Sequence, residues 1–146
     1  MSSSSIDEVV GGCLAVRVRL ISRALTGIYD GALGEHGVTI AQVNLLAAVG
    51  KAGPCPPSRL GEILQLERST VSRNVGLLLK HGWIEAVSSD AKGIREIAIT
   101  RAGRGKIESV MPRWRQAQQQ ATELLGASGV GTLHEIAGDL GYPPDA

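Results

Sequence analysis

The chain has no phenylalanine, and aromatic residues make up only 3% of it. A hydrophobic core must therefore be built mainly from Leu, Ile, Val and Ala. No uninterrupted apolar segment approaches the ~20 residues of a membrane-spanning helix. The opening MSSSSIDEVVGG also lacks the basic and apolar regions of a signal peptide. The sequence therefore predicts a cytoplasmic protein with no membrane association.

Cysteine and histidine are also scarce. Cys13 and Cys55 lie far apart, and the three histidines (His36, His81 and His134) show no i,i+4 spacing. This pattern argues against a disulfide scaffold and against a Cys/His metal site. No Ser, His and Asp residues form a recognisable catalytic motif either. We predict that the chain is not an enzyme and needs no metal or cofactor.

Charge is uneven along the chain, although the formal net charge is only +1. Residues 1–58 carry no net charge, and residues 107–146 carry a net charge of −3. Residues 59–106 hold nine basic and five acidic residues. A basic segment of this kind favours a polyanionic partner. The length of the chain fits one domain, so we expect residues 1–146 to form a single one.

Both ends of the chain have helical patterns. Apolar residues recur at three- and four-residue spacing over 7–33, which predicts a long helix. Similar patterns predict another long helix over 104–125 and a short one over 129–140. The helix over 7–33 carries more apolar surface than one neighbour can cover. We therefore predict that the helices within 7–33 and 104–140 pair with a second copy of the chain.

The middle of the chain, about residues 38–100, combines short helices with a hairpin. After a turn at 34–37, Thr39 and Ser58 are suited to cap helices over 40–50 and 58–66. The prolines of 53–58 predict an irregular loop with an exposed Cys55. β-Branched residues flank a polar loop and predict a hairpin that residues 100–105 end. The fold class is mainly α with a small β-wing: a winged helix-turn-helix between long N- and C-terminal dimerisation helices.

The helix predicted over 68–80 has two chemically different faces. At 100° per residue, Val71, Val75 and Leu78 fall on one side, with Leu79 beside them, and this side predicts the core face. Leu77 points partly outward and has no evident role. The opposite side carries small hydroxyl and basic residues: Ser69, Arg73, Gly76 and Lys80, flanked by Thr70, Ser72 and Asn74.

This outward side suits the major groove of duplex DNA. Ser69 and Thr70 are short enough to let the backbone approach a phosphate. Arg73 has the forked guanidinium that matches guanine O6 and N7. The alternative is that Ser69 or Thr70 only caps the helix, while Arg73 and Lys80 are solvated surface charges.

The sequence LGEILQLERSTVSRNVGLLLKHGWIE at 60–85, the hairpin after it and ITRAG at 99–103 resemble the MarR family of transcriptional regulators. Residues 67–74 match the family's (D/E)-R-S-T-(L/V)-S-R-N pattern residue by residue. Thr100 and Gly103 match its L-T-x-x-G exit from the wing. Residues 19–46 look like the family's first two helices, so the resemblance spans nearly the whole chain.

The resemblance implies a homodimeric transcriptional regulator, generally a repressor, that a small-molecule effector or another signal releases from DNA. Its two winged helix-turn-helix units would bind successive major grooves of a palindromic, double-stranded operator. The residues do not specify the effector. The expected DNA-binding residues are Arg68, Ser69, Thr70, Ser72, Arg73, Asn74, Lys92 and Arg95.

The wing departs from the family pattern, in which two arginines closely follow an Asp. Here Lys92 and Arg95 follow Asp90, and Gly93 lies near an expected arginine. Lys92 is the expected probe of the minor groove or its phosphates, and a lysine reads the groove less specifically than an arginine. Asp90 is expected to orient a basic neighbour. The alternative is a solvated hairpin tip.

Cys13 lies near the position of the reactive cysteine in peroxide-sensing members of the family, so a thiol-based redox-sensing regulator is an alternative. Those relatives use tyrosines of neighbouring helices as donors, and here only Tyr29 is near in the sequence. A buried cysteine that acts as a small hydrophobe is the commoner case. An alternative from another class is a winged-helix protein–protein interaction module without DNA binding.

Overall fold

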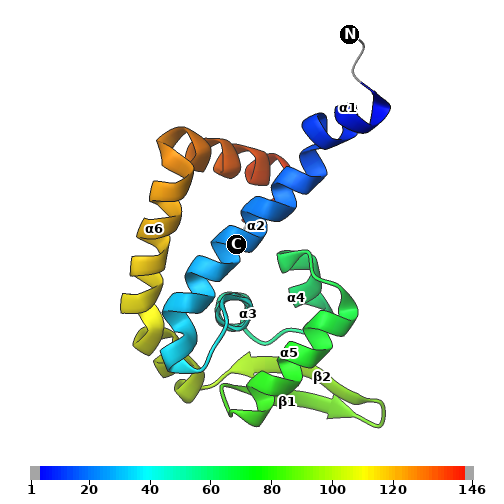
Figure 1. Cartoon of the computed structure of the whole chain (residues 1–146). Coiled ribbons are helices and arrows are strands. Elements are labelled where there is room, and N and C mark those ends of the chain that lie inside the picture. Colours follow the sequence, from blue (N-terminus) through cyan, green and yellow to red (C-terminus); the bar gives the residue numbers. More distant parts are fainter. Residues whose placement is uncertain (1–3, 144–146) are drawn as a thin grey trace.

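The computed structural model describes residues 4–143, which form a mainly helical fold with a two-stranded wing (Figure 1). This arrangement, with long helices near both ends that pack together, confirms the predicted fold class. The elements are α1 (Ser5–Gly12), α2 (Leu14–Leu33), the 3-10 helix η1 (Gly34–His36), α3 (Ile40–Ala52), α4 (Pro57–Leu64), α5 (Arg68–Lys80), β1 (Ile84–Asp90), β2 (Gly93–Ile99) and α6 (Arg101–Asp139). α3 contacts α2 and α6 as well as α4, α5 and β2, so it lies between the helical ends (α1, α2 and α6) and the wing (β1 and β2).

The single N-terminal helix predicted over 7–33 is wrong, because the backbone leaves the helical conformation at Cys13 (φ −64°, ψ 115°) and separates α1 from α2. Gly11 and Gly12 precede the break, and a glycine inside a helix costs about 1 kcal/mol relative to alanine. The Arg17 guanidinium donates to the carbonyl oxygens of Gly11 and Cys13, the latter at 3.0 Å. A side chain from α2 therefore holds the bend.

The starts of α3 and α4 differ from one another in how they are capped. Thr39 caps α3 as predicted: its hydroxyl accepts from the Gln42 N–H at 3.3 Å, and the Gln42 side chain accepts from the Thr39 N–H at 3.0 Å. The predicted cap of α4 by Ser58 is wrong. Pro56 is the N-cap and Pro57 opens the helix, because proline's fixed φ suits a first turn whose N–H groups have no helical partner.

The proline-rich loop at 53–58 is more ordered than predicted, and Cys55 is buried rather than exposed, with 5% of its surface accessible. Cys55 and Ile97 exchange two backbone hydrogen bonds of 3.0 and 2.9 Å, which fix the loop against β2. Burial raises the pKa of the Cys55 thiol; Arg59 acts to lower this pKa and Glu96 to raise it.

The hairpin forms where the sequence predicts it. β1 pairs with β2 in antiparallel register from Ile84–Ile99 to Asp90–Gly93. Two shifts of register, around Val87 and Arg95, interrupt the ladder. Such bulges increase the local twist of a hairpin and redirect side chains near its tip.

The hairpin ends where predicted, but α6 begins at Arg101, three residues before the predicted helix start at 104. Thr100 is the N-cap of α6: its hydroxyl accepts from the Gly103 N–H at 3.0 Å and donates to the Gly82 carbonyl at 2.7 Å. A Cβ on Gly103 would lie 2.1 Å from the Trp83 carbonyl oxygen. Both residues therefore fix α6 against the segment that follows α5.

α6 consists of two helical segments that meet at Gly126 (φ 71°, ψ 164°), between the two predicted C-terminal helices. Glycine adopts this positive φ without the steric cost of a Cβ. Pro112 lies inside the first segment. After Gly126 the chain turns back toward α2 (Figure 1), where Leu133 lines an apolar hollow with Val18 and Ile21.

Two clusters of buried side chains form the core, and Trp83 packs against both. Lys106 fixes this junction, because its ammonium lies 5.1 Å from the centre of the Trp83 ring and donates to the His36 carbonyl at 2.6 Å. The smaller cluster joins α2, α3 and α6: Leu33, Val38, Val43 and Val110. The larger lies within α3 to β2: Leu45, Leu46, Val49, Cys55, Leu60, Val71, Val75, Leu78, Ile84 and Ile97.

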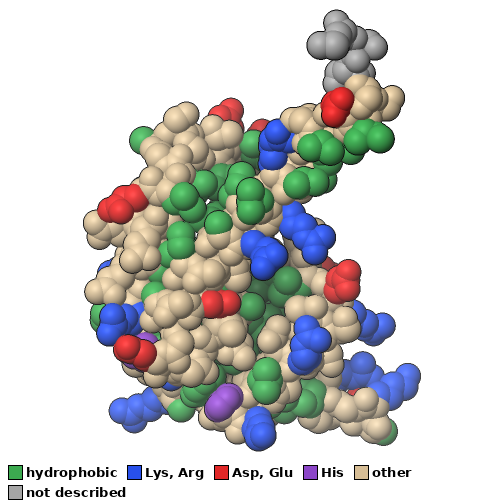
Figure 2. All heavy atoms as spheres, in the orientation of Figure 1, with side chains coloured by type: hydrophobic (Ala, Val, Ile, Leu, Met, Phe, Trp, Pro, Cys, Tyr) green, Lys and Arg blue, Asp and Glu red, His purple; other side chains and the backbone are tan. Residues whose placement is uncertain are grey.

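The helical ends expose much apolar surface. Figure 2 shows hydrophobic side chains along α1 and the start of α2, where Leu14 is 75% and Leu20 66% accessible. None of the helices within residues 4–143 has the length and apolar character needed to cross a bilayer. Other large exposed apolar side chains of these ends are Ile6, Val9, Val10, Val16, Val18, Leu124, Ile136 and Leu140.

Candidate nucleic-acid interface

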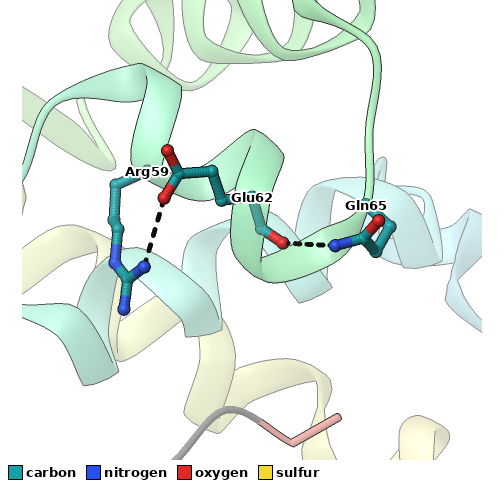
Figure 3. Close-up of polar contacts among 3 residues, drawn as sticks. All are labelled: Arg59, Glu62 and Gln65. Atoms are coloured by element: carbon teal, nitrogen blue, oxygen red, sulfur yellow. Dashed lines mark hydrogen bonds and ion pairs between the residues drawn. The ribbon is translucent and has the colours of Figure 1, made fainter. Parts of the chain in front are cut away.

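A tight turn joins α4 to α5 and sets the angle between them (Figure 3). Gln65 has a positive φ of 53°, and its side chain donates to the Glu62 carbonyl at 2.9 Å. The Leu66 N–H donates to the Gly61 carbonyl at 3.0 Å. A Cβ on Gly61 would lie 3.2 Å from the Leu66 oxygen and 3.4 Å from Val71. Glycine at this position therefore lets α4 and α5 approach closely.

The faces of α5 are those the sequence predicts. Val71, Val75 and Leu78 are buried, and Leu79 packs against the same core cluster. Among the predicted contact residues, Arg68, Ser69, Ser72 and Arg73 are exposed, whereas Thr70 and Asn74 are half-buried at the flanks. Within residues 4–143, none of these six side chains has a hydrogen bond or ion pair to another residue. Their polar groups are therefore available to a ligand outside the subunit.

The start of α5 decides against the capping alternative. The N-cap is Glu67, whose side chain makes no capping hydrogen bond, and Ser69 and Thr70 are the second and third residues of the helix. The interpretation of either hydroxyl as a cap is therefore wrong. The first N–H groups of a helix have no intrahelical acceptor and attract anions. The hydroxyl groups of α5 thus lie beside an intrinsically anion-binding helix end.

The wing is held in shape by Asp90. Its carboxylate accepts from the Lys92 N–H at 2.8 Å and forms an ion pair with the Arg95 guanidinium. Asp90 therefore orients a basic neighbour, as predicted. Lys92 lies in the two-residue turn between the paired residues Asp90 and Gly93, and its side chain is exposed. The structure places Lys92 at the tip of the hairpin and Arg95 in β2, two residues after Gly93.

A groove runs between α4, α5 and β2. Ser72 and Gly76 of α5 line one wall, and Ile94 and Arg95 of the wing line the other. Basic side chains gather on this part of the molecule, at the lower right of Figure 2. Arg95 therefore faces the same groove as α5, whereas Lys92 does not line it.

The structure also exposes basic side chains that are not among the predicted contact residues. Arg59, in the first turn of α4, forms an ion pair with Glu62 at 3.2 Å (Figure 3), and its side chain is 51% accessible. Arg101 and Arg104 are exposed at the start of α6. None of these three residues lines the groove between α5 and the wing.

Cys13 is a partly exposed residue and the N-cap of α2. Tyr29 lies sixteen residues later, about 24 Å along the helix, and its hydroxyl bonds to Gln118 on α6. Tyr29 of the same subunit is therefore too far away to donate to the thiol. Over the described part of the chain, no three His, Cys, Asp or Glu side chains are grouped as a metal site requires.

The arrangement of α4, α5 and the hairpin matches a known family. Residues 36–93, from η1 to the start of β2, match the model of the MarR family. Residues 36–93 therefore belong to the MarR family. MarR-family proteins are transcriptional regulators without enzymatic activity, which confirms the prediction that this chain is not an enzyme.

Solved structures show the same fold over nearly the whole chain. A probable transcriptional regulator from Pseudomonas aeruginosa is 24% identical, with 90% of this chain and 98% of that one covered and a TM-score of 0.76. A MarR mutant from E. coli, complexed with operator DNA, is 20% identical with coverages of 94% and 99% and a TM-score of 0.78. BpsR of Bordetella bronchiseptica, whose DNA binding 6-hydroxynicotinic acid regulates, is 18% identical with coverages of 89% and 95% and a TM-score of 0.75. No curated protein matches the chain.

Proposed function

We propose that this MarR-family chain is a homodimeric transcriptional regulator that binds a palindromic operator in duplex DNA. The observation that carries the proposal is the outward face of α5, where hydroxyl and guanidinium groups have no partner within the described residues. Phosphates and base edges would provide their hydrogen-bond partners. Operator DNA in the complex of the similar E. coli protein supports this assignment. The proposed contacts are Arg68, Ser69, Thr70, Ser72, Arg73, Asn74, Lys92 and Arg95.

The dimer is proposed from the exposed apolar surface of α1, α2 and the end of α6. A monomer that left side chains such as Leu14 and Leu20 in water would expose an unusually large apolar patch. Burying these side chains against a second copy stabilises the pair by about 25 cal/mol per Å² of apolar area. Two-fold symmetry then presents two α5 helices about 34 Å apart, one turn of duplex DNA.

We propose that the regulator acts as a cytoplasmic repressor which a small molecule releases from DNA. The apolar hollow between α2, α3 and the end of α6 lies where the helical ends meet the winged unit, with Tyr29 and Asn44 among its polar lining. Regulation of the similar BpsR by 6-hydroxynicotinic acid supports this mode of control. A ligand releases DNA only if it binds the DNA-free conformation of the protein more tightly than the DNA-bound conformation.

The test is DNA binding by the intact chain. DNA that flanks its gene, labelled with a fluorophore, should bind at least tenfold more tightly than random DNA of the same length. Arg73→Ala should weaken binding to the flanking DNA about tenfold or more and reduce its preference over random DNA. Arg113→Ala, which changes an exposed arginine of α6 outside the interface, should leave both affinities unchanged.

Two other outcomes separate the alternatives. A dimer that binds neither flanking nor random DNA would identify a winged-helix protein-interaction module. Equal losses on both DNAs for Arg73→Ala would remove its base-reading role.

Redox control through Cys13 is the alternative signal, supported by the partly exposed thiol at the start of α2. It requires peroxide to release DNA from the native chain and not from Cys13→Ser.

A further inference from the structure

α5 carries one feature that the proposed contacts leave unexplained, an exposed leucine on the polar side of the helix. Leu77 is 38% accessible, whereas Leu78 beside it is fully buried and Leu79 packs against the core. Leu77 belongs to neither core cluster and does not line the groove between α5 and the wing. Within the described residues of α5, it is the large apolar side chain that faces solvent.

The position of Leu77 follows from helix geometry. It comes one turn after Arg73, which places it about 6 Å further along the helix and about 40° around it. Thr70, Arg73 and Leu77 therefore form one edge of the outward face. Successive base pairs are about 3.4 Å apart, so Leu77 would lie one or two base pairs from a base that Arg73 contacts.

Major-groove edges offer one apolar group to such a side chain, the C5 methyl of thymine. A leucine cannot bond to phosphate or to a base edge, and solvent exposure of its methyl groups is unfavourable. We infer that Leu77 is a specificity-determining residue that packs against a thymine methyl beside the base contacted by Arg73. This inference rests on the proposed operator binding by α5.

The experiment uses the full chain and a DNA sequence selected from a random duplex library by repeated binding. Each thymine of the selected sequence is replaced in turn by uracil, which keeps every hydrogen bond and removes the methyl group. One replacement in each half-site should weaken binding of the native chain about fourfold, the value of one buried methyl-sized group. The same replacement should not change the affinity of Leu77→Ala.

Two further variants make the result specific. Leu77→Met keeps an apolar contact and should retain the dependence on thymine. Val87→Ala removes an exposed apolar side chain of the wing, 48% accessible, and should also retain it because the wing does not read this position. Thermal unfolding followed by circular dichroism verifies that each variant is folded.

The outcomes are distinguishable from a failure of the proposed function. If the library yields no preferred sequence, operator recognition by α5 and the role of Leu77 are both wrong. If a sequence is selected but the native chain tolerates uracil everywhere, only the thymine contact is wrong. An undiminished uracil effect in Leu77→Ala also overturns the assignment, because another residue must then contact the methyl group.

Discussion

The winged unit (α3 to β2) and the helical ends (α1, α2 and α6) differ in how far they bury their apolar side chains. From α3 to β2 most of the large apolar residues converge on one continuous cluster, in which Leu45, Leu60 and Leu78 are completely buried. In α1 and the first half of α2 the corresponding residues point into solvent. The comparison indicates that the winged unit packs mainly on itself, whereas in the proposed homodimer the helical ends would complete their packing against a second chain.

The largest effect is expected at the joint between the two regions. In Gly103→Ala the new Cβ would lie 2.1 Å from the Trp83 carbonyl oxygen and 2.9 Å from Ile99, so the start of α6 must move away from the hairpin. We expect a loss of about 3 kcal/mol or more in the free energy of unfolding. Urea denaturation followed by circular dichroism measures it.

Gly105→Ala is the matched control for this variant. Nothing lies within 4 Å of its added Cβ, and alanine is the better helix former. It should stabilise the protein by about 0.5–1 kcal/mol. Equal losses in both variants would show that α6 tolerates no side chain at its start, for reasons other than the Trp83 contact.

A charge on the helical ends should separate the subunits without unfolding the winged unit. Leu20→Glu places a carboxylate on the proposed interface, where burial of an unpaired charge is costly. The dimer dissociation constant measured by sedimentation should rise at least tenfold, since a buried leucine contributes about 1.5–3 kcal/mol. Val87→Glu, on the wing, should leave the dimer intact, and a loss there instead would move the interface to the hairpin.

A smaller effect is expected where the hairpin exits into α6. Thr100→Val removes the hydroxyl that accepts from Gly103 and donates to the Gly82 carbonyl. The lost cap should reduce the free energy of unfolding by about 1–2 kcal/mol. Thr122→Val, which removes one exposed side-chain bond inside α6, should change it by less than about 0.5 kcal/mol. A reversed order of these two losses would contradict the capping role.

The smallest effect belongs to the tip of the wing. Lys92→Ala should weaken binding of specific and random DNA alike, by about twofold to threefold, and should reduce the salt dependence by about one phosphate contact. Affinity titrations at several salt concentrations measure this slope. Arg115→Ala, an exposed arginine of α6, is the control that should leave it unchanged. An unchanged slope in Lys92→Ala would indicate a solvated tip.

The sequence predicts best the elements whose periodicity or turn chemistry is local. The faces of α5 and the Thr39 cap follow from spacing within a few residues, and the hairpin follows from two β-branched runs around a polar loop. The family pattern also marked Thr100 and Gly103, although only the structure shows their contacts with Gly82 and Trp83.

The errors arise where a distant residue, or a choice between neighbouring alternatives, decides the conformation. Burial of Cys55 depends on pairing with Ile97, more than forty residues later, and a single proline-rich stretch gives no sign of it. The bend at Cys13 depends on Arg17, whose guanidinium donates to the carbonyl oxygens of Gly11 and Cys13 rather than to water. Capping of α4 by Pro56 instead of Ser58 was a choice between adjacent candidates that helix preferences alone do not decide.

The position of Trp83 between the two core clusters has a consequence for its fluorescence. Its indole packs against both core clusters and lies beneath the Lys106 ammonium, while its other neighbour His81 stacks 4.3 Å away at the end of α5. A rotation of the winged unit against the long helices would change the polarity around this one ring. In a Trp114→Phe background, the emission wavelength of Trp83 would therefore follow such a rotation directly, with no attached dye.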